Sequence, residues 1–435
     1  MNRRVPFAFA GVIAEYNPFH LGHRYHLEMT KSLTGADFCV AVMSGSFVQR
    51  GEPAMFDKYL RTRMALLNGA DLVFEIPAPF STAPARDFAD FGVRLLDAVG
   101  ADFLCFGSEC GQMAPLKAAA DALREESLEF KTVLKSRLRA GDSFPKARAA
   151  ALTVSLNGSG GVTLSPEAAS VLSSPNNILA AEYLRAMAEN GSPMKAFTVK
   201  RQGRGYNDTD LNSAAKGQGE AGEAALAFAS ASAVRKAVRN GRAGDAAAAV
   251  PSNINLQAAG ASYLTAEDLA PVLNYKIMEI IRNDGKNGLT RFAGVSPDLA
   301  ARIAAASPQY FGTDRLIQEI KTKDLTYSRA SRALTHILLG ITVQDMEFFK
   351  KEETPLYARI LGFRRSAVPL LSEIKKRAEI PLVTKLSAAG SFLPPAARRL
   401  LESEIYAAHL WQNTCQRMWG NTFKNEYRQS PVILD

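Results

Sequence analysis

The sequence predicts an α/β fold, in which a doubly wound parallel sheet is followed by a mostly α-helical part. Short, largely apolar runs alternate with amphipathic stretches through the first half of the chain, as is typical of strands covered by helices on both faces. Glycine stands between a helix-like and a strand-like stretch at two places, where it can end the helix. Beyond about residue 243, alanine-rich and leucine-rich helical periodicity takes over.

The elements of the first part follow from these patterns. The predicted strands are Phe7–Ile13, Phe38–Met43, Leu72–Glu75, Phe103–Phe106 and Ala196–Lys200. The predicted helices are His23–Leu33, Asp57–Asn68, Phe88–Ala98, Leu116–Arg139, Pro175–Glu189 and Ala231–Val238. The helix-ending glycines open Gly69-Ala70-Asp71 and Gly100-Ala101-Asp102. Glycine and polar residues predict a turn at Asn157–Gly161 and a loop at Gly203–Gly222.

The second part is expected to be helical. Its predicted helices are Glu267–Arg282, Pro297–Ala305, Thr313–Ile320, Tyr327–Leu339 and Ala396–Trp419. A chain of 435 residues is too long for one ordinary core. We therefore predict two domains, 1–245 and 246–435.

Composition indicates a cytoplasmic protein with a polyanionic partner. The net charge of +9 favours nucleic acid first and an anionic membrane surface second, although a merely basic surface is the alternative. The four cysteines are too few and too scattered for a disulfide framework or a zinc site. Arg3 and Arg4 before the apolar run Val5–Ala14 imitate a signal peptide, but we interpret this run as the first strand. No apolar stretch approaches the roughly 20 residues of a membrane helix.

One segment carries the pattern of a phosphate-binding site. Three of the five histidines lie within Asn17–His26, directly after the first predicted strand and at the start of the first helix. Free backbone N–H groups and the helix dipole favour a phosphate at such a junction. Gly22 allows close approach of a ligand, and His20 and His23 on either side of it can donate to phosphate oxygens. The alternative is that these histidines cap the helix or fill the core, and His26 in particular suits packing.

Several motifs resemble a known family. His20-Leu21-Gly22-His23 resembles the HxGH signature of a nucleotidyltransferase superfamily, which implies a Rossmann-like first domain. Within that superfamily the chain is similar to the bacterial tRNA(Met) cytidine acetate ligases. The segments that carry the likeness are Glu15–His20, Ser44–Ala54, Gly69–Val73, Phe106–Glu109, Ser174–Leu179, Ser230–Arg235, Lys321–Lys323 with Thr326 and Tyr327, and Leu361–Phe363.

The resemblance implies an ATP site. Its residues would be Ile13, Ala14, Glu15, Tyr16, Asn17, Pro18, Phe19, His20, Leu21, Gly22, His23, Arg24, Tyr25, His26, Gly107, Asn176 and Arg201. Gly107 follows a predicted strand at the edge where such sheets bind ligands, Asn176 offers a donor and an acceptor, and Arg201 can bind phosphate. A turn glycine, a helix cap and a surface arginine are the respective alternatives.

Two further segments complete the expected site. Ser230–Arg235 resembles the superfamily's second phosphate-binding signature, in which Ser230 or Ser232 would cap a helix and Arg235 would reach the departing pyrophosphate. Helix capping alone is the alternative. Ser44–Ala54 is interpreted either as a wall of the acceptor pocket or as a structural loop. The chain departs from the family pattern at Asn207, where a histidine is usual, and in the long loop before Ser230.

Basic clusters in the second part predict contact with RNA phosphates. They comprise Lys321, Lys323, Arg329 and Arg332 near Tyr327, and Arg359, Arg364, Arg365, Lys375, Lys376, Arg377 and Lys385 further on. A solvated helix face is the alternative for each cluster.

The resemblance implies a reaction in two steps. Acetate would attack the α-phosphorus of ATP to form acetyl-adenylate, while His20 and His23 stabilise the transition state. Mg²⁺ would accompany the nucleotide. The acetyl group would then pass to N4 of the wobble cytidine of elongator tRNA(Met), presented by the helical domain. Two other functions stay open: an adenylyltransferase acting on a small phosphorylated metabolite, and a non-catalytic RNA-binding protein with a vestigial nucleotide site.

Overall fold

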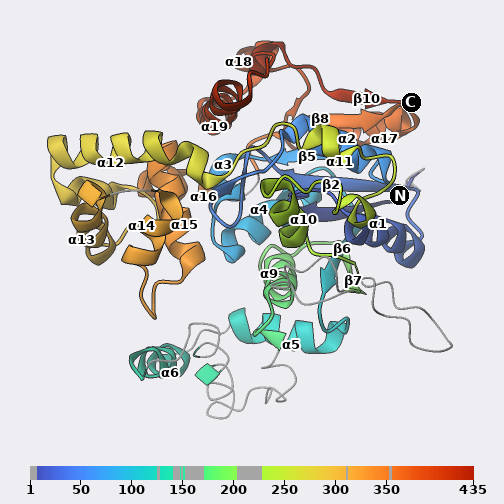
Figure 1. The fold of residues 1–435 in the computed structure, drawn as a ribbon. Coiled ribbons are helices and arrows are strands. Elements are labelled where there is room, and N and C mark those ends of the chain that lie inside the picture. Colours follow the sequence, from blue (N-terminus) through green and yellow to red (C-terminus); the bar gives the residue numbers. More distant parts are fainter. Residues whose placement is uncertain are drawn as a thin grey trace.

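A mostly parallel sheet forms the centre of the molecule (Figure 1). The computed structural model describes residues 7–124, 128–140, 147, 150–151, 171–202, 228–309, 312–351 and 355–435. The strands of the sheet are β1 (Phe9–Ala14), β2 (Phe38–Ser44), β5 (Leu72–Ile76), β6 (Phe103–Ser108), β7 (Lys195–Lys200), β8 (Ala358–Arg364), β9 (Leu382–Val383) and β10 (Val432–Leu434). Their order is β10-β8-β5-β2-β1-β6-β7, with β9 beside β8. Strands β5, β2, β1, β6 and β7 are parallel neighbours, which confirms the predicted doubly wound sheet.

Alternate side chains of each strand enter two separate cores. On β2, Val40 and Val42 pack into one core, whereas Cys39, Ala41 and Met43 pack into the other. Helices cover the sheet on both faces, so nearly every position of the inner strands β2 and β5 is buried. This explains why the strands read as continuous apolar runs in the sequence.

Most helices of the first part lie where the sequence predicts them, although the short helix Ala78–Ser81 was not predicted. They are α1 (Leu21–Thr34), α2 (Lys58–Leu67), α3 (Ala78–Ser81), α4 (Ala85–Ala98), α5 (Met113–Arg124), α6 (Leu128–Arg139), α9 (Pro175–Glu189) and α10 (Ala231–Arg239). The single helix predicted at Leu116–Arg139 is wrong, because α5 and α6 are separate elements. Gly69 and Gly100 have φ angles of 114° and 81°, as expected of glycines that end a helix. The segments 157–161 and 203–222 lie outside the described residues.

The second part is mostly helical but also returns to the sheet. Its helices are α11 (Leu256–Ala259), α12 (Ala270–Asp284), α13 (Pro297–Ala306), α14 (Thr313–Ile320), α15 (Tyr327–Leu339), α16 (Val343–Lys350), α17 (Val368–Arg377), α18 (Leu386–Phe392) and α19 (Pro395–Trp419). Strand β8 pairs antiparallel with β5, and β10 pairs with β8. The sheet is therefore built from both sides of residue 245, and the division at 245/246 remains a prediction.

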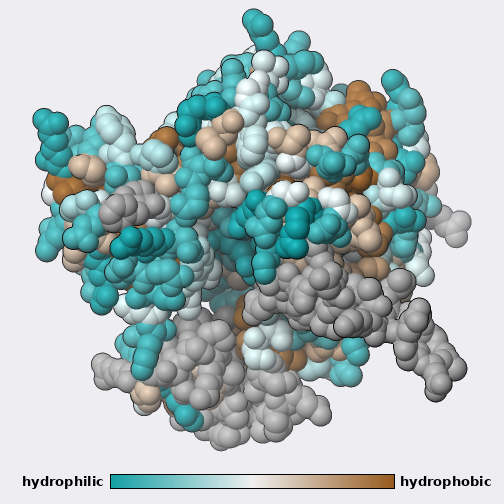
Figure 2. Space-filling view, in the orientation of Figure 1, coloured by the Kyte–Doolittle hydropathy of each residue, from teal (hydrophilic) through white to brown (hydrophobic). Residues whose placement is uncertain are grey.

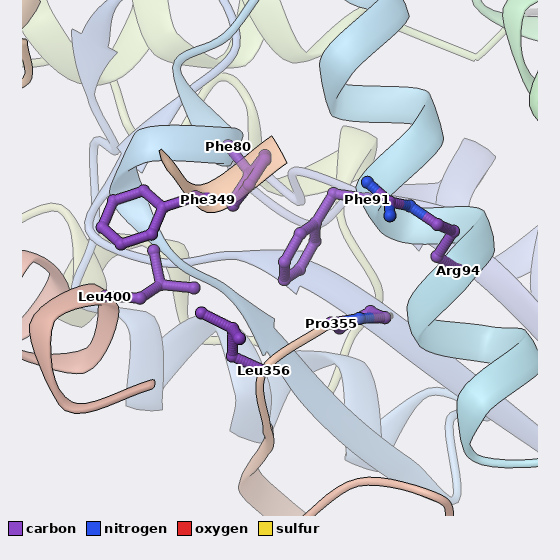
Figure 3. A pocket seen from close by; sticks show the side chains of 7 residues that line it. All are labelled: Phe80, Phe91, Arg94, Phe349, Pro355, Leu356 and Leu400. Atoms are coloured by element: carbon purple, nitrogen blue, oxygen red, sulfur yellow. The ribbon is translucent and has the colours of Figure 1, made fainter. Parts of the chain in front are cut away.

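Apolar contacts join the second part to the first. Phe349 on α16 and Leu400 on α19 line a small cavity together with Phe80 and Phe91 of the first part (Figure 3). The ring centroids of Phe80 and Phe91 are 4.3 Å apart in a stacked arrangement. This cavity lies within the interface between helices and is separate from the HxGH turn. Of the helices that the structure describes, none has the length and apolarity to cross a membrane.

Candidate functional site

The predicted nucleotide residues meet at the switch point of the sheet. From β1 the chain winds outward through β2 and β5, and it then returns to the other side of β1 with β6 and β7. A crevice is expected outside the carboxyl ends of the strands at such a point. The HxGH turn follows β1, Gly107 lies near the end of β6, and Arg201 directly follows β7.

The HxGH turn is held in one conformation by packing and by a helix cap. Tyr16, which is buried, has a φ angle of 48°, a strained region for a bulky residue. Its ring centroid lies 4.9 Å from those of Phe19 and His23. His20 is the N-cap of α1, and a Cβ at Gly22 would lie only 2.8 Å from His20 Cε1. Glycine is therefore required for this cap.

The backbone contacts of the two histidines define their tautomers. The N–H of Gly22 donates to His20 Nδ1 at 3.0 Å, and the N–H of His20 donates to His23 Nδ1 at 3.3 Å. Each neutral ring therefore carries its proton on Nε2. The rings are stacked with centroids 3.8 Å apart. The turn thus offers two N–H donors to a ligand at the start of α1.

The surroundings keep these histidines neutral. Burial, together with the charges of Arg201 and Arg235, lowers the pKa of His20 to about 3. The pKa of His23 is well below its usual value because of burial, His20 and Arg201. Burial and Arg201 also lower the pKa of His26 to about 4. A group of cations that opposes protonation of its neighbours is complementary to a polyanion.

Gly107, Asn176 and Arg201 lie together beside β6 and β7. Arg201 Nη1 is 3.5 Å from Asn176 Oδ1, and Arg201 Cγ lies 3.5 Å from where a Cβ at Gly107 would be. Asn176 Nδ2 donates to Glu109 Oε1 at 2.6 Å, and Asn177 N donates to Glu109 Oε2 at 2.8 Å. Glu109 therefore caps α9 and orients the Asn176 amide toward Arg201.

Helix α10 brings a second arginine to the HxGH turn. Arg235 Nη1 donates to Asn17 O at 2.7 Å, and its Nη2 lies 3.7 Å from Glu52 Oε1. Ser230 caps α10 by accepting from Ala233 N at 3.1 Å. The capping interpretation of Ser230 thus describes its contact in the structure, while Arg235 directly touches the predicted site.

Other residues of the predicted ATP segment face away from the histidines. Ile13 packs under Gly92 of α4 on one face of the sheet. Arg24 forms an exposed ion pair with Glu28 at 2.8 Å. The Tyr25 hydroxyl accepts from Gln202 Nε2 at 3.0 Å. Contacts of these three residues with ATP remain predictions, and their side chains now have other partners.

Arg61 is a positioning residue that the sequence did not reveal. Its fully buried guanidinium donates to Glu15 O at 2.6 Å and to Ser44 O at 3.1 Å, and it also bonds to Gly45 O. It therefore ties the loop after β1 to the loop after β2. Nothing in the predicted helix 57–68 distinguishes Arg61 from a surface arginine, because the partners are backbone atoms of distant segments.

The segment Ser44–Ala54 forms a wall beside the turn. It contains the hairpin β3 (Phe47–Val48) and β4 (Glu52–Pro53), where only a loop was expected. Gln49 N donates to Glu15 Oε1 at 3.0 Å, and Glu52 approaches Arg235. On its other side Gly51 O accepts from Ser331 Oγ at 2.7 Å and Thr335 Oγ1 at 2.6 Å of α15.

The two basic clusters are not brought together. Arg329 and Arg332 lie on α15, which packs against β4. Phe363 pairs with Leu72, the first residue of β5, and Arg364 follows Phe363. Arg364 therefore lies at the amino ends of the parallel strands, whereas the HxGH turn lies at their carboxyl ends. Arg365 pairs with Asp435 at 2.6 Å, and Lys376 lies 3.6 Å from Glu373. The RNA contact predicted for Arg359 is wrong, because this side chain is buried and paired with Glu75 and Glu426. Of the two clusters, the one at α14 and α15 adjoins the hairpin beside the site.

The fold and the site define a class of proteins. A His-x-Gly-His turn at the switch point of a parallel sheet, beside two arginines, is the arrangement expected of a nucleotidyltransferase. Consistent with this, residues 7–426 match the family model of the HIGH Nucleotidyl Transferase family. Among the described residues, no three His, Cys, Asp or Glu side chains are grouped to hold a metal ion.

Known relatives identify the family more closely. The chain is 38% identical to a tRNA(Met) cytidine acetate ligase of Acetivibrio thermocellus, over 98% of this chain and 99% of the relative. It is 36% identical to that of a Thermoanaerobacter species, over 92% and 94%. A crystal structure of Thermotoga maritima TmcAL in the apo form has a TM-score of 0.86 at 29% identity, over 98% and 99%. Another, bound with alpha-thio ATP, has a TM-score of 0.83 at 28% identity over the same shares. This chain belongs to the tRNA(Met) cytidine acetate ligase family of HIGH nucleotidyltransferases.

Proposed function

We propose that the chain activates acetate with ATP and transfers the acetyl group to N4 of the wobble cytidine of elongator tRNA(Met). The observation that carries the chemical part is the pair of neutral, stacked histidines His20 and His23, with both Nε2–H groups available beside Arg201 and Arg235. The choice of acetate and of this tRNA is supported by the names of the relatives.

In the first step an acetate oxygen attacks the α-phosphorus of ATP. The bond from this phosphorus to the bridging oxygen breaks, pyrophosphate leaves with the electron pair, and acetyl-adenylate is formed. His20 and His23 donate hydrogen bonds to phosphate oxygens as negative charge develops, while Arg201 and Arg235 stabilise the triphosphate. Acetate is ionised near neutral pH, so this step needs no general base.

In the second step the N4 amine of cytidine attacks the acetyl carbonyl carbon. The bond between this carbon and the adenylate oxygen breaks, AMP leaves, and the amine loses one proton. The RNA must reach the acetyl group from outside the crevice. In this proposal the cluster Lys321, Lys323, Arg329 and Arg332 holds it, which is supported by the packing of α15 against the hairpin beside the HxGH turn.

Mg²⁺ bound to the triphosphate is part of the proposal, because it would neutralise charge on the β- and γ-phosphates. We place the reaction in the cytoplasm, where free cysteines are stable. Cys39, Cys105, Cys110 and Cys415 are all unbridged.

The test is ATP–pyrophosphate exchange with and without acetate, in the presence and absence of tRNA. The native chain should exchange only with acetate, and His20→Ala should lose at least roughly 100-fold, because a donor to the transition state is removed. His409→Ala, which changes a histidine on α19 outside the turn, is the matched control. His20→Asn and thermal unfolding of each variant separate loss of chemistry from loss of fold.

Other outcomes would replace the proposal. Pyrophosphate release that depends on a phosphate ester, with tRNA without effect, would indicate an adenylyltransferase acting on a small metabolite. Salt-dependent tRNA binding that survives His20→Ala, with no exchange under any condition, would indicate a non-catalytic RNA-binding protein.

A further inference from the structure

One face of α15, the helix that packs against the hairpin beside the nucleotide site, is buried over most of its length and exposed at its first residue. Tyr327, Ser331 and Thr335 are spaced four residues apart, so they lie along the same face of the helix. Ser331 and Thr335 are buried against Gly51 of the hairpin, whereas Tyr327 is 45% exposed. The face therefore emerges from the interface at Tyr327.

The hairpin fixes where this face emerges. Gly51 has a φ angle of 77°, and a Cβ there would lie 2.4 Å from the backbone nitrogen of Arg332. Helix and hairpin are thus in direct backbone contact. The next hairpin residue, Glu52, approaches Arg235 of the HxGH site. The pKa of the Tyr327 phenol is raised by burial and by Asp314, and the nearby Glu52 raises it further. Tyr327 lies one helical turn before Ser331, whose hydroxyl donates to Gly51 O of this hairpin, so it is close to the hairpin residue that approaches Arg235.

A hydrogen bond from its hydroxyl fixes the position of the Tyr327 side chain. Its hydroxyl donates to Asp314 Oδ1 on α14 at 2.9 Å. With its hydroxyl bonded and its side chain nearly half exposed, the residue can offer aromatic surface to a planar group without first losing much conformational freedom. Figure 2 shows a hydrophilic recess between the lobe of α12–α15 and the part of the molecule that contains α10.

The turn that precedes Tyr327 carries two exposed lysines, while the Tyr327 hydroxyl itself is bonded to the carboxylate of Asp314. Lys321, Lys323 and Arg329 are exposed near Tyr327. The turn that carries the two lysines is ordered, because Thr322 Oγ1 accepts from Asp324 N at 3.3 Å and from Leu325 N at 3.0 Å. An exposed aromatic ring with cations around it is the pattern by which proteins bind an unstacked nucleotide, with the base on the ring and the phosphates on the cations.

We infer that Tyr327 is the platform on which the acceptor base of the RNA stacks while its amine is presented to the adenylate. This inference rests on the proposed function and extends it by naming the residue that selects a base rather than a phosphate. The cations and the ring have separate roles in this inference: the cations contact phosphates and position the RNA, and the ring stacks on the base. Hence Tyr327 affects only the second step.

The experiment compares the two steps in Tyr327→Ala, Tyr327→Phe and Tyr327→Trp. Acetate-dependent ATP–pyrophosphate exchange should stay within about twofold of the native chain in all three. In Tyr327→Ala, kcat/KM for transfer of labelled acetate to tRNA should fall roughly 10- to 100-fold, the value of one base stack. The Phe and Trp variants keep an aromatic ring and should retain most of the transfer. Tyr275→Ala, which removes a 68% exposed tyrosine from α12, should change neither step.

Binding of an anticodon stem–loop RNA gives an independent measurement. The native chain should bind the intact RNA more tightly than the same RNA without its acceptor base, and Tyr327→Ala should bind both equally. A preference that persists in Tyr327→Ala, unchanged transfer in that variant, or a parallel loss of exchange would each overturn the inference. Absence of acetate-dependent exchange in the native chain would instead refute the proposed function, and the binding comparison would still decide the role of Tyr327.

Discussion

Two groups of buried charges at the carboxyl side of the sheet differ in how they are neutralised. In the first, Lys58 Nζ lies within 3.1 Å of three carboxylates, those of Glu75, Glu404 and Glu426. Arg359 completes it, with Glu75 at 2.8 Å and Glu426 at 2.7 Å. In the second, Arg201 and Arg235 stand beside the HxGH turn. Within 4.0 Å the described residues offer Arg235 one carboxylate, that of Glu52 at 3.7 Å, and Glu15 interacts with it from further away.

The pKa directions show the same contrast. Burial and the neighbouring Glu75 together raise the pKa of Glu404 to about 8, which favours its neutral form at pH 7. Two cations then face two carboxylates, and the first group is balanced by itself. At the HxGH turn the arginines instead depress the pKa values of the histidines. A balanced group indicates a structural tie, and an unbalanced one indicates a place for a ligand of opposite charge.

Removing one member of the balanced group should have the largest effect. Lys58→Met leaves buried carboxylates without their cation, and we expect the free energy of unfolding to fall by about 3–5 kcal/mol. Urea unfolding measures it. The control is Arg302→Met, which breaks an exposed pair with Asp298 at 2.9 Å on α13 and should cost less than about 0.5 kcal/mol. Equal stabilities for the two variants would mean that the buried group does not tie the two parts together.

Removing a cation from the unbalanced group should weaken ATP binding and spare the fold. Arg235→Gln removes a charged hydrogen-bond donor to the triphosphate, and we expect the KM for ATP to rise roughly 10- to 100-fold. Stability without ATP should change by no more than about 1 kcal/mol, because the main interaction within the protein that this substitution removes is the hydrogen bond to Asn17 O.

The matched control is Arg239→Gln, one turn further along α10 and exposed. It should leave the KM for ATP unchanged. A large loss of stability in Arg235→Gln with an unchanged KM would instead place Arg235 with the structural charges, and the contrast between the two groups would fail.

Local sequence patterns were enough to predict the parallel sheet and the HxGH turn. Buried parallel strands are continuous apolar runs, and the motif lies within one short segment, so both are visible without tertiary contacts. Strand β8 escaped prediction because Gly362 interrupts its short apolar run and basic residues surround it. Its partner β5 is almost 300 residues away, and no local pattern records such a pairing.

Long-range contacts also explain what was missed in the site. Lys58, Glu404 and Glu426 look like ordinary surface charges in the sequence, and their burial depends on how α19 and the C-terminal segment return to the sheet. The same reason hides the role of Arg61. Conversely, Arg364 and Lys375 belong to a basic cluster that resembles an RNA-binding site in the sequence. Because β8 runs antiparallel to β5, Arg364 lies at the end of the sheet away from the HxGH turn.

The smallest expected effect is a change in the pH dependence of stability. His20 is neutral in the fold because its pKa is about 3, whereas the unfolded chain binds a proton at its ordinary pKa near 6.5. Stability must therefore fall as the pH drops from about 6.5 toward 4. His20→Gln lacks this proton uptake, so its stability should decline less steeply, by about 1.4 kcal/mol per pH unit.

His336→Gln separates this effect from catalysis. His336 on α15 is buried, and burial lowers its pKa to about 4. Its Nδ1 lies 2.8 Å from Ala293 O and its Nε2 lies 3.2 Å from Thr82 Oγ1, so both ring nitrogens have partners within the protein. Its variant should flatten the pH slope as His20→Gln does, but only His20→Gln should abolish exchange. Urea unfolding at several pH values between 6.5 and 5 measures the slopes. An unchanged slope in His20→Gln would show that the ring is protonated in the fold, and the excess of positive charge assigned to the turn would then be wrong.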